Sequence, residues 1–474
     1  MDSNSVLTFF KEITRIPRES GHEEAMTAYL QSFAASRNLK CRTDRKGNVV
    51  IMKDASAGKE NVPVIVLQGH QDMVCEKISG HSHDFAKDPI EYEIEDGWMI
   101  ARNTTLGADD GIGVAAALAL LDSNVPMGRL ECLFTTSEEV GMYGAHGMEE
   151  GMINGKVLIN MDSEDEGQLF IGCAGGMDSI IEFSYAKEPL RQGFKTVRLK
   201  ISNAVGGHSG DDIDKGRMNA VQQIARFLYG ELEYGFQLIL LKGGNKPNAI
   251  AREAEAIIAT DDVDAAIGRF ETFGKTLKNE FSISDPDVLF EAAPFRCTEK
   301  PIEEDVKVRL VSSLFACPHG VEAMSRDIPG LVETSSNLAA VRMKESGIIQ
   351  VVTSQRSSVD SALAGIAAKV EACFRLAGAK VSHSSPYPGW KPRLDSKLLK
   401  VCVNSYEKLF GSKPEVKAIH AGLECGLFLT KFPDLDMISF GPTLRGVHAP
   451  GERLDLKSLD KFTALLDDVV CNYE

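Results

Sequence analysis

Four short apolar runs in this sequence are each followed closely by a histidine or a carboxylate. In chain order they are Val64–Leu67 before His70, Leu130–Phe134 before Glu138 and Glu139, Val157–Asn160 before Asp162, and Met437–Phe440 before a loop with His448. Short, nearly continuous apolar runs are typical of strands in a mostly parallel sheet that is buried on both faces. Because open α/β sheets carry their sites at the carboxyl ends of the strands, we expect these polar residues at one edge of such a sheet.

The length of 474 residues exceeds the ~250–300 residues at which one hydrophobic core stops growing. Near residue 188 the pattern changes to an α+β succession, with strands predicted at Val197–Ile201 and Gln237–Leu241 and a helix at Asn219–Tyr229. The proline- and serine-rich segment His383–Pro392 is interpreted as the return crossing. The sequence therefore predicts a discontinuous α/β domain, residues 1–187 and 390–474, with an inserted α+β domain at 188–389.

The formal net charge of −16 argues against binding to nucleic acid or to anionic membranes. The first 24 residues mix charges throughout, and no span reaches ~18 uninterrupted apolar residues. We therefore expect no secretory signal, no transmembrane helix and a cytoplasmic location.

A group of histidines and carboxylates offers the ligand types that two zinc ions need, and it comprises His70, Asp109, Glu139, Asp162 and His448. Two divalent cations carry four positive charges, and three carboxylates with one hydroxide supply four negative ones. Zinc is the expected metal, with cobalt or manganese as alternatives, because ligand types alone do not determine the metal.

Two further carboxylates are candidates for supporting roles. Asp72 lies two residues after His70, so in an extended segment it points to the same side and can accept the remaining imidazole proton. Glu138 and Glu139 are adjacent, so on an extended backbone they would point to opposite sides; one of them should then bind metal and the other should serve as general base and acid. Taken singly, each of these motifs is more often a surface polar pair or a helix cap; their joint occurrence after strand ends favours a catalytic site.

The sequence resembles a known family. The motifs that carry the resemblance are, in order, GHQDMV, TTLGADDGIG, TSEEVGMYGA, NMDSED, GGHSG, GGNKPNAI, HAGLECG and GPTLRGVHAPGE. They are similar to those of the co-catalytic zinc peptidases of the aminoacylase and carboxypeptidase type, most closely the cytosolic aminoacyl-histidine dipeptidase group (peptidase D, carnosinase-like). The eight motifs extend over nearly the whole chain.

The resemblance implies a role for each candidate ligand. It implies His70 and Asp162 on one zinc, Glu139 and His448 on the other, and Asp109 bridging both, with a cis peptide between Asp109 and Asp110. By the same resemblance Glu138 becomes the general base and Asp72 the residue that orients His70.

For the inserted domain the resemblance implies a lid that also forms a homodimer. His208 in GGHSG would stabilise the oxyanion, either in its own chain or in the partner subunit, or would only stabilise its loop. Asn248 and Arg356 fit substrate-binding positions, since an arginine can donate two parallel hydrogen bonds to a carboxylate; Arg217 and Arg342 remain competitors. Gly422 would bring backbone close to the substrate, and Glu424 would meet an α-amine or serve as a structural acid.

The leading hypothesis is a dipeptidase that hydrolyses small peptides, including Xaa-His substrates such as β-alanyl-histidine, by direct attack of a metal-bound hydroxide. The alternatives are an N-acyl amino acid deacylase on the same site and a non-catalytic metal-binding scaffold. The segment His81–Asp84 is interpreted as a loop, His319 and His383 as structural, and Glu452 as a loop or supporting acceptor.

Overall fold

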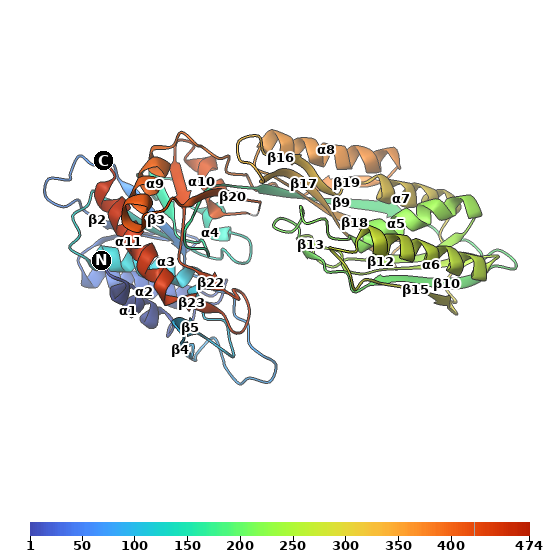
Figure 1. The fold of residues 1–474 in the computed structure, drawn as a ribbon, viewed down its shortest axis with the longest axis horizontal. Coiled ribbons are helices and arrows are strands. Elements are labelled where there is room, and N and C mark those ends of the chain that lie inside the picture. The colour runs from blue at the N-terminus through green and yellow to red at the C-terminus, as the bar shows by residue number, and fades with distance from the viewer. Residues whose placement is uncertain (421) are drawn as a thin grey trace. The chain divides into compact units, whose positions relative to one another are not determined.

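The computed structural model describes residues 1–420 and 422–474, which form two compact units (Figure 1). The first unit comprises Met1–Gly172, Trp390–Ala418 and Leu423–Glu474, and the second comprises Cys173–Gly389 and Ile419–Gly422. None of the described helices is long and apolar enough to cross a membrane.

The first unit is built on an eight-stranded mixed sheet in the order β1-β2-β6-β3-β7-β21-β8-β20. The central strands β6, β3, β7 and β21 pair in parallel, whereas β2 pairs with β6, and β8 with β21, in the antiparallel direction. Every residue of β3, β6 and β7 is buried, so both faces of the sheet are covered. The predicted apolar runs are confirmed as strands, and the chain has the expected α/β class.

The strands of the eight-stranded sheet are β1 (Lys40–Thr43), β2 (Val49–Lys53), β3 (Ile65–His70), β6 (Leu130–Thr135), β7 (Val157–Asn160), β8 (Gln168–Cys173), β20 (Glu415–Ile419) and β21 (Asp436–Ser439). A four-stranded sheet contains β4 (Glu93–Glu95), β5 (Trp98–Ile100), β22 (Leu444–Arg445) and β23 (Arg453–Asp455). The helices are α1 (Ser3–Ile13), α2 (Glu24–Ser36), α3 (Ala108–Asp122), α4 (Tyr143–Gly147), α9 (Lys397–Phe410), α10 (Glu424–Lys431) and α11 (Leu456–Asn472).

Local sequence accounts for several of these elements. The Asp96-Gly97 turn joins β4 to β5, with φ of 49° and 81° at its two residues, the conformation that this dipeptide favours. The alanine- and leucine-rich helix α3 is buried along almost its whole length and packs against α1 and β3. Asp109 and Asp110, within its first turn, depart from helical geometry.

The second unit is built on a nine-stranded sheet whose main order is β15-β10-β14-β12-β17-β18-β9-β19, with β16 paired to β17. Along β10, buried Val197, Leu199 and Ile201 alternate with more accessible Arg198 and Lys200, the period-two pattern of a sheet covered on one face. Helices α5 to α8 pack on that face and share one apolar core with it (Figure 1).

The strands of this sheet are β9 (Gly175–Ser184), β10 (Lys195–Ser202), β12 (Gln237–Gly243), β14 (Ala254–Thr260), β15 (Leu289–Pro294), β16 (Gly320–Met324), β17 (Val332–Lys344), β18 (Ile348–Ser357) and β19 (Lys380–His383). Its helices are α5 (Ala220–Glu231), α6 (Val263–Glu280), α7 (Glu304–Ala316) and α8 (Asp360–Leu376), with a 3-10 turn at Leu232–Tyr234. A separate two-stranded sheet pairs β11 (Gly207–His208) with β13 (Ala249–Ile250).

The expected domain boundaries need two corrections. Residues 173–187 belong to the second unit, because β9 pairs with β18 along ten positions of the nine-stranded sheet. Ile419–Gly422 also belong to the second unit, where the Ile419 carbonyl accepts a hydrogen bond from the Ala174 N–H at 3.1 Å.

Candidate metal centre

His70 is the last residue of β3 and lies almost fully buried at the carboxyl edge of the first unit's sheet. Its Nε2 lies 3.1 Å from Asp109 Oδ1 and 3.5 Å from Asp162 Oδ1. On the other side of the ring, Nδ1 faces Asp72 Oδ1 at 3.4 Å. The imidazole therefore lies between Asp72 on its Nδ1 side and Asp109 and Asp162 on its Nε2 side.

Asp109 lies at the distorted start of α3, and its peptide bond to Asp110 is cis. Glu452, which is 2% exposed, caps this helix end. Its carboxylate accepts from the backbone N–H groups of Leu106 and Ala108, both at 2.8 Å, of Gly107 at 3.0 Å and of Asp109 at 3.4 Å. Since the first N–H groups of a helix have no partner within it, one carboxylate here satisfies the whole segment that presents Asp109.

His448 approaches Asp109 from a loop far along the chain, with its backbone in the left-handed conformation (φ 63°). Its Nε2 lies 3.0 Å from Asp109 Oδ2 and 2.8 Å from Glu139 Oε1. Asp109 thus has one oxygen beside each histidine.

The donor atoms form groups that fit two divalent cations. One group joins His70, Asp109 and Asp162, and another joins Asp109, Glu139 and His448; within each group the donor atoms lie within 4.8 Å of one another. Ligands at ~2.0–2.2 Å around a tetrahedral ion stand about 3.4 Å apart, close to the 2.8–3.5 Å between the two histidine nitrogens and the carboxylate oxygens beside them. Asp109 is common to both groups, and a third group joins His70 with Glu138 and Glu139.

The electrostatics of the centre also favour cations. Burial and the Asp109 charge raise the pKa of Asp162 well above its usual value, and hydrogen bonds to Asp109 and Glu139 raise the pKa of His448 to about 11. Asp162 and His448 therefore bind protons more readily than such groups usually do. Bound cations favour carboxylates that are ionised and imidazoles that are neutral, so they would replace these protons.

Glu138 and Asp72 lie beside these groups. Burial and the charges of Glu424 and Glu139 raise the pKa of Glu138 well above its usual range. Asp72 accepts hydrogen bonds from the N–H of Glu138 at 3.1 Å and from the N–H of Glu139 at 3.2 Å. Although burial opposes it, the hydrogen bond and charge of His70 lower the pKa of Asp72 to about 2. One carboxylate thus contacts both His70 and the segment that carries the two glutamates.

The remaining predicted site residues lie in the second unit, where two of them are in contact. Arg356, near the end of β18, is 6% exposed. Its Nη2 lies 3.5 Å from His208 Nε2, its Nη1 donates to the Tyr387 hydroxyl at 3.2 Å, and its Nε donates to the Ser209 hydroxyl at 3.4 Å. None of these three partners is a carboxylate, so the described contacts leave the guanidinium charge available to an anion.

Asn248 is exposed in the turn before β13, and its carbonyl accepts from the Ser209 N–H at 2.9 Å. Gly422 is half-buried. The competing arginines have other partners: Arg217 pairs with Asp212 at 3.0 Å, and Arg342 is exposed and donates to Asn245.

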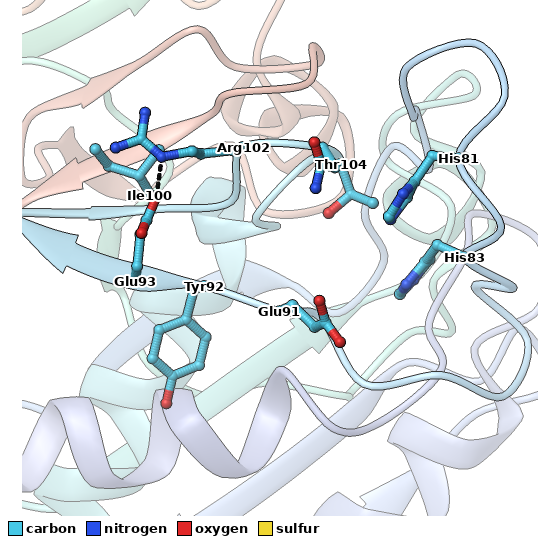
Figure 2. Close-up of a pocket in the computed structure, with 9 residues that line it drawn as sticks. His81, His83, Glu91, Tyr92, Glu93, Ile100, Arg102 and Thr104 are labelled. Carbon is cyan, nitrogen blue, oxygen red and sulfur yellow. Dashed lines mark hydrogen bonds and ion pairs between the residues drawn. The ribbon is translucent and has the colours of Figure 1, made fainter.

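A cavity of about 230 Å³ in the first unit lies outside this set of ligands. His81, His83, Glu91 and Thr104 line it (Figure 2). The segment from His81 to Asp84 contains neither helix nor strand, as interpreted from the sequence. Within the part of the chain that the structure describes, neither histidine belongs to a group of donors close enough for one metal ion.

Three residues near the sites were missed or undervalued by sequence reasoning. Arg18 is fully buried between the segment that follows His70 and the one that precedes Asp109, and no motif marks it. Glu424 is buried, and its Oε2 accepts from Gln68 at 2.6 Å and Thr135 at 2.7 Å, whereas Oε1 has no hydrogen-bond partner. In the second unit, buried His420 bonds to Ser335 at 2.8 Å; its place in HAGLECG was its only signal.

Comparison with known proteins identifies the family of the chain. The profile of peptidase family M20/M25/M40 matches residues 66–472, and the chain belongs to this family. It is 39% identical over 468 residues to the cytosol non-specific dipeptidase of Escherichia coli K12, covering 97% of this chain and 96% of that protein.

Solved structures show the same fold. The aminoacylhistidine dipeptidase of Vibrio alginolyticus superposes with a TM-score of 0.91 at 38% identity, covering 99% of this chain and 96% of that one. The aminopeptidase PepT of Bacillus cereus shares the fold, with a TM-score of 0.61 at 16% identity over 99% of this chain and 98% of that one.

Proposed function

We propose that this protein is a two-metal dipeptidase that accepts Xaa-His dipeptides such as β-alanyl-histidine among its substrates. The observation that carries the proposal is the pair of three-donor groups that share Asp109. The names of the Escherichia coli and Vibrio alginolyticus relatives support a dipeptide as the substrate class. By the same likeness we propose a cytosolic location.

His70 and Asp162 would hold one cation, Glu139 and His448 the other, and Asp109 both. When bound, the two cations supply Lewis acidity and make water a stronger acid near neutral pH. We assign zinc, with cobalt or manganese as working substitutes.

The protein's own residues provide the proton transfer. Glu138 takes a proton from the attacking water and delivers it to the leaving amine. Its place beside both donor groups, within the group that joins it to His70 and Glu139, suits this exchange, because a general base must lie within reach of the attacking water. Asp72 holds the ring of His70 and the backbone of Glu138 in place.

The second unit would bind the substrate and form a homodimer. In this proposal Arg356 pairs with the substrate carboxylate, His208 stabilises the oxyanion, and Asn248 and the Gly422 backbone position the peptide. Mixed dimers of His208→Ala and Glu138→Ala chains would regain activity at one of two sites if His208 acts on the partner subunit's substrate.

The test is turnover of a small substrate panel by zinc-loaded protein. β-Alanyl-histidine, glycyl-histidine and alanyl-alanine should be cleaved, and Nα-acetyl-alanine and Nα-acetyl-histidine should not. Preference for the acetylated compounds would instead establish the deacylase. No turnover of any compound with two metals bound would favour a non-catalytic scaffold.

A further inference from the structure

Arg18 lies in the segment after α1 and is one of the most deeply buried charged residues of the first unit, at 2% exposure. Its guanidinium donates to backbone carbonyls of two different segments. Nη1 donates to Asp72 O at 2.7 Å and to Gln71 O at 3.3 Å, and Nη2 donates to Gly107 O. The first segment directly follows His70, and the second ends two residues before Asp109.

The backbone around Arg18 strengthens the first of these links. The Arg18 carbonyl accepts from the Met73 N–H at 3.0 Å. Ser20 donates from its hydroxyl to Asp72 Oδ2 at 2.8 Å. The chain from Arg18 to Ser20 therefore runs beside the segment that follows the ligand His70.

The start of α3 is shaped to fit the guanidinium. A Cβ added at Gly107 would lie 2.5 Å from Arg18 Nη2, and one added at Gly111 would lie 2.6 Å from the same atom. Two glycines of TTLGADDGIG thus leave the space that this side chain fills, on both sides of Asp109.

Arginine suits this position better than other residues. Its planar group carries five donors in a fixed fork, so one side chain can bond carbonyls of two loops at once. Burial lowers the pKa of Arg18, while the nearby charges of Glu452 and Asp72 raise it. Among the described residues no carboxylate forms an ion pair with Arg18, so its hydrogen bonds serve the backbone carbonyls.

We propose that Arg18 is a positioning residue of the metal centre: it joins the segment after His70 to the turn before Asp109 and so holds ligands of the two cations at their required separation. The inference rests on the proposed two-metal function. Loss of the guanidinium would remove its bonds to the two segments and leave them joined by the hydrogen bonds of Thr105 to Val74 and Glu76. The donor atoms of the ligands would then move away from their required separation. Metal binding would weaken although no ligand is removed.

The experiment compares Arg18→Met and Arg18→Lys with the wild type and with Lys307→Met. Lys307 is a matched control, because it is a buried cation of the second unit whose Nζ donates to the Phe236 carbonyl at 2.6 Å. Zinc and cobalt dissociation constants are measured by competition with a chelator, alongside thermal midpoints. We expect binding to weaken about 10- to 100-fold in Arg18→Met, less in Arg18→Lys, and not at all in Lys307→Met.

Two further readouts separate positioning from general destabilisation. The visible spectrum of cobalt-loaded Arg18→Met should differ from that of the wild type, and kcat should fall more than KM rises. If Arg18→Met does not fold, Gly111→Ala serves instead, since it keeps the charge and displaces the guanidinium.

Wild-type affinity and spectrum in Arg18→Met, or in Gly111→Ala where that variant is needed, would overturn the proposal. Failure of the wild type to bind two ions would instead contradict the proposed function.

Discussion

The two units arrange their polar residues in opposite ways. In the first unit, three carboxylates and two histidines converge at strand ends and loops, and burial with neighbouring negative charge raises the pKa values of Asp162 and of the adjacent Glu138. In the second unit, a buried arginine contacts a histidine and two hydroxyls. The first arrangement suits cations and the second suits an anion. The comparison teaches that a site's ligand can be inferred from the charge that its buried groups leave unbalanced.

The largest effect is expected for Asp109→Asn, which tests whether the first unit binds cations. Because Asp109 belongs to both donor groups, its loss should weaken both cations, whereas Asp162→Asn and His448→Gln should each weaken one. We expect activity to fall to background and metal content after dialysis to fall from two ions to none, against about one for the single-group variants. Metal analysis of the three dialysed proteins measures this. An Asp109→Asn protein that keeps two ions would show that the groups are not cation sites.

Glu138→Gln sharpens the assignment within the first unit. It removes the proton carrier but no proposed ligand, so kcat should fall about 10²- to 10⁴-fold while two ions stay bound. Glu139→Gln is the matched control, one residue away, and should lose metal. Steady-state kinetics with metal analysis distinguishes the two. Metal loss from Glu138→Gln would mean that the two glutamates have exchanged roles.

Arg356→Met tests the second unit. A hydrogen bond to a charged group contributes roughly 1.5–3 kcal/mol, so KM for dipeptides should rise about 10- to 100-fold. For the same dipeptides with a C-terminal amide, the variant and the wild type should differ little, because the substrate charge is already absent. Arg217→Met and Arg342→Met are controls with other partners. An equal loss for acids and amides would contradict a carboxylate-binding role.

The parts of the molecule that could be predicted are those with a local signal. The strand runs, the Asp96-Gly97 hairpin and the ligand motifs are short patterns. The order of the motifs along the chain indicated that residues hundreds of positions apart belong to one site. The predicted boundary between the domains was wrong because the sequence pattern of Gly175–Ser184 does not indicate which sheet this strand joins. Only its pairing with β18 shows that it belongs to the second unit.

Supporting residues were harder to predict, because their partners are backbone groups distant in sequence. Arg18 bonds to carbonyls 53, 54 and 89 positions away, and nothing in RIPRES indicates this. Glu452 was recognised only as an acceptor near His448. Its capping of the Asp109 segment depends on a contact that spans more than 340 positions.

The smallest expected effect concerns acid sensitivity in the second unit. Burial, followed by the charge of Arg356, lowers the pKa of His420 to about 4. The unfolded chain, with an ordinary histidine pKa of about 6.5, binds a proton that the native state does not, so stability is lost as pH falls from about 6.5 to about 4. His420→Gln should therefore show a smaller drop in thermal midpoint between pH 7.5 and 5.0, by several degrees. His146→Gln, at an exposed histidine of the first unit, should keep the wild-type drop. An unchanged drop in His420→Gln would mean that His420 is not held neutral in the folded protein. The residues around Arg356 would then tolerate a second positive charge, which would contradict the inference that this part of the second unit suits an anion.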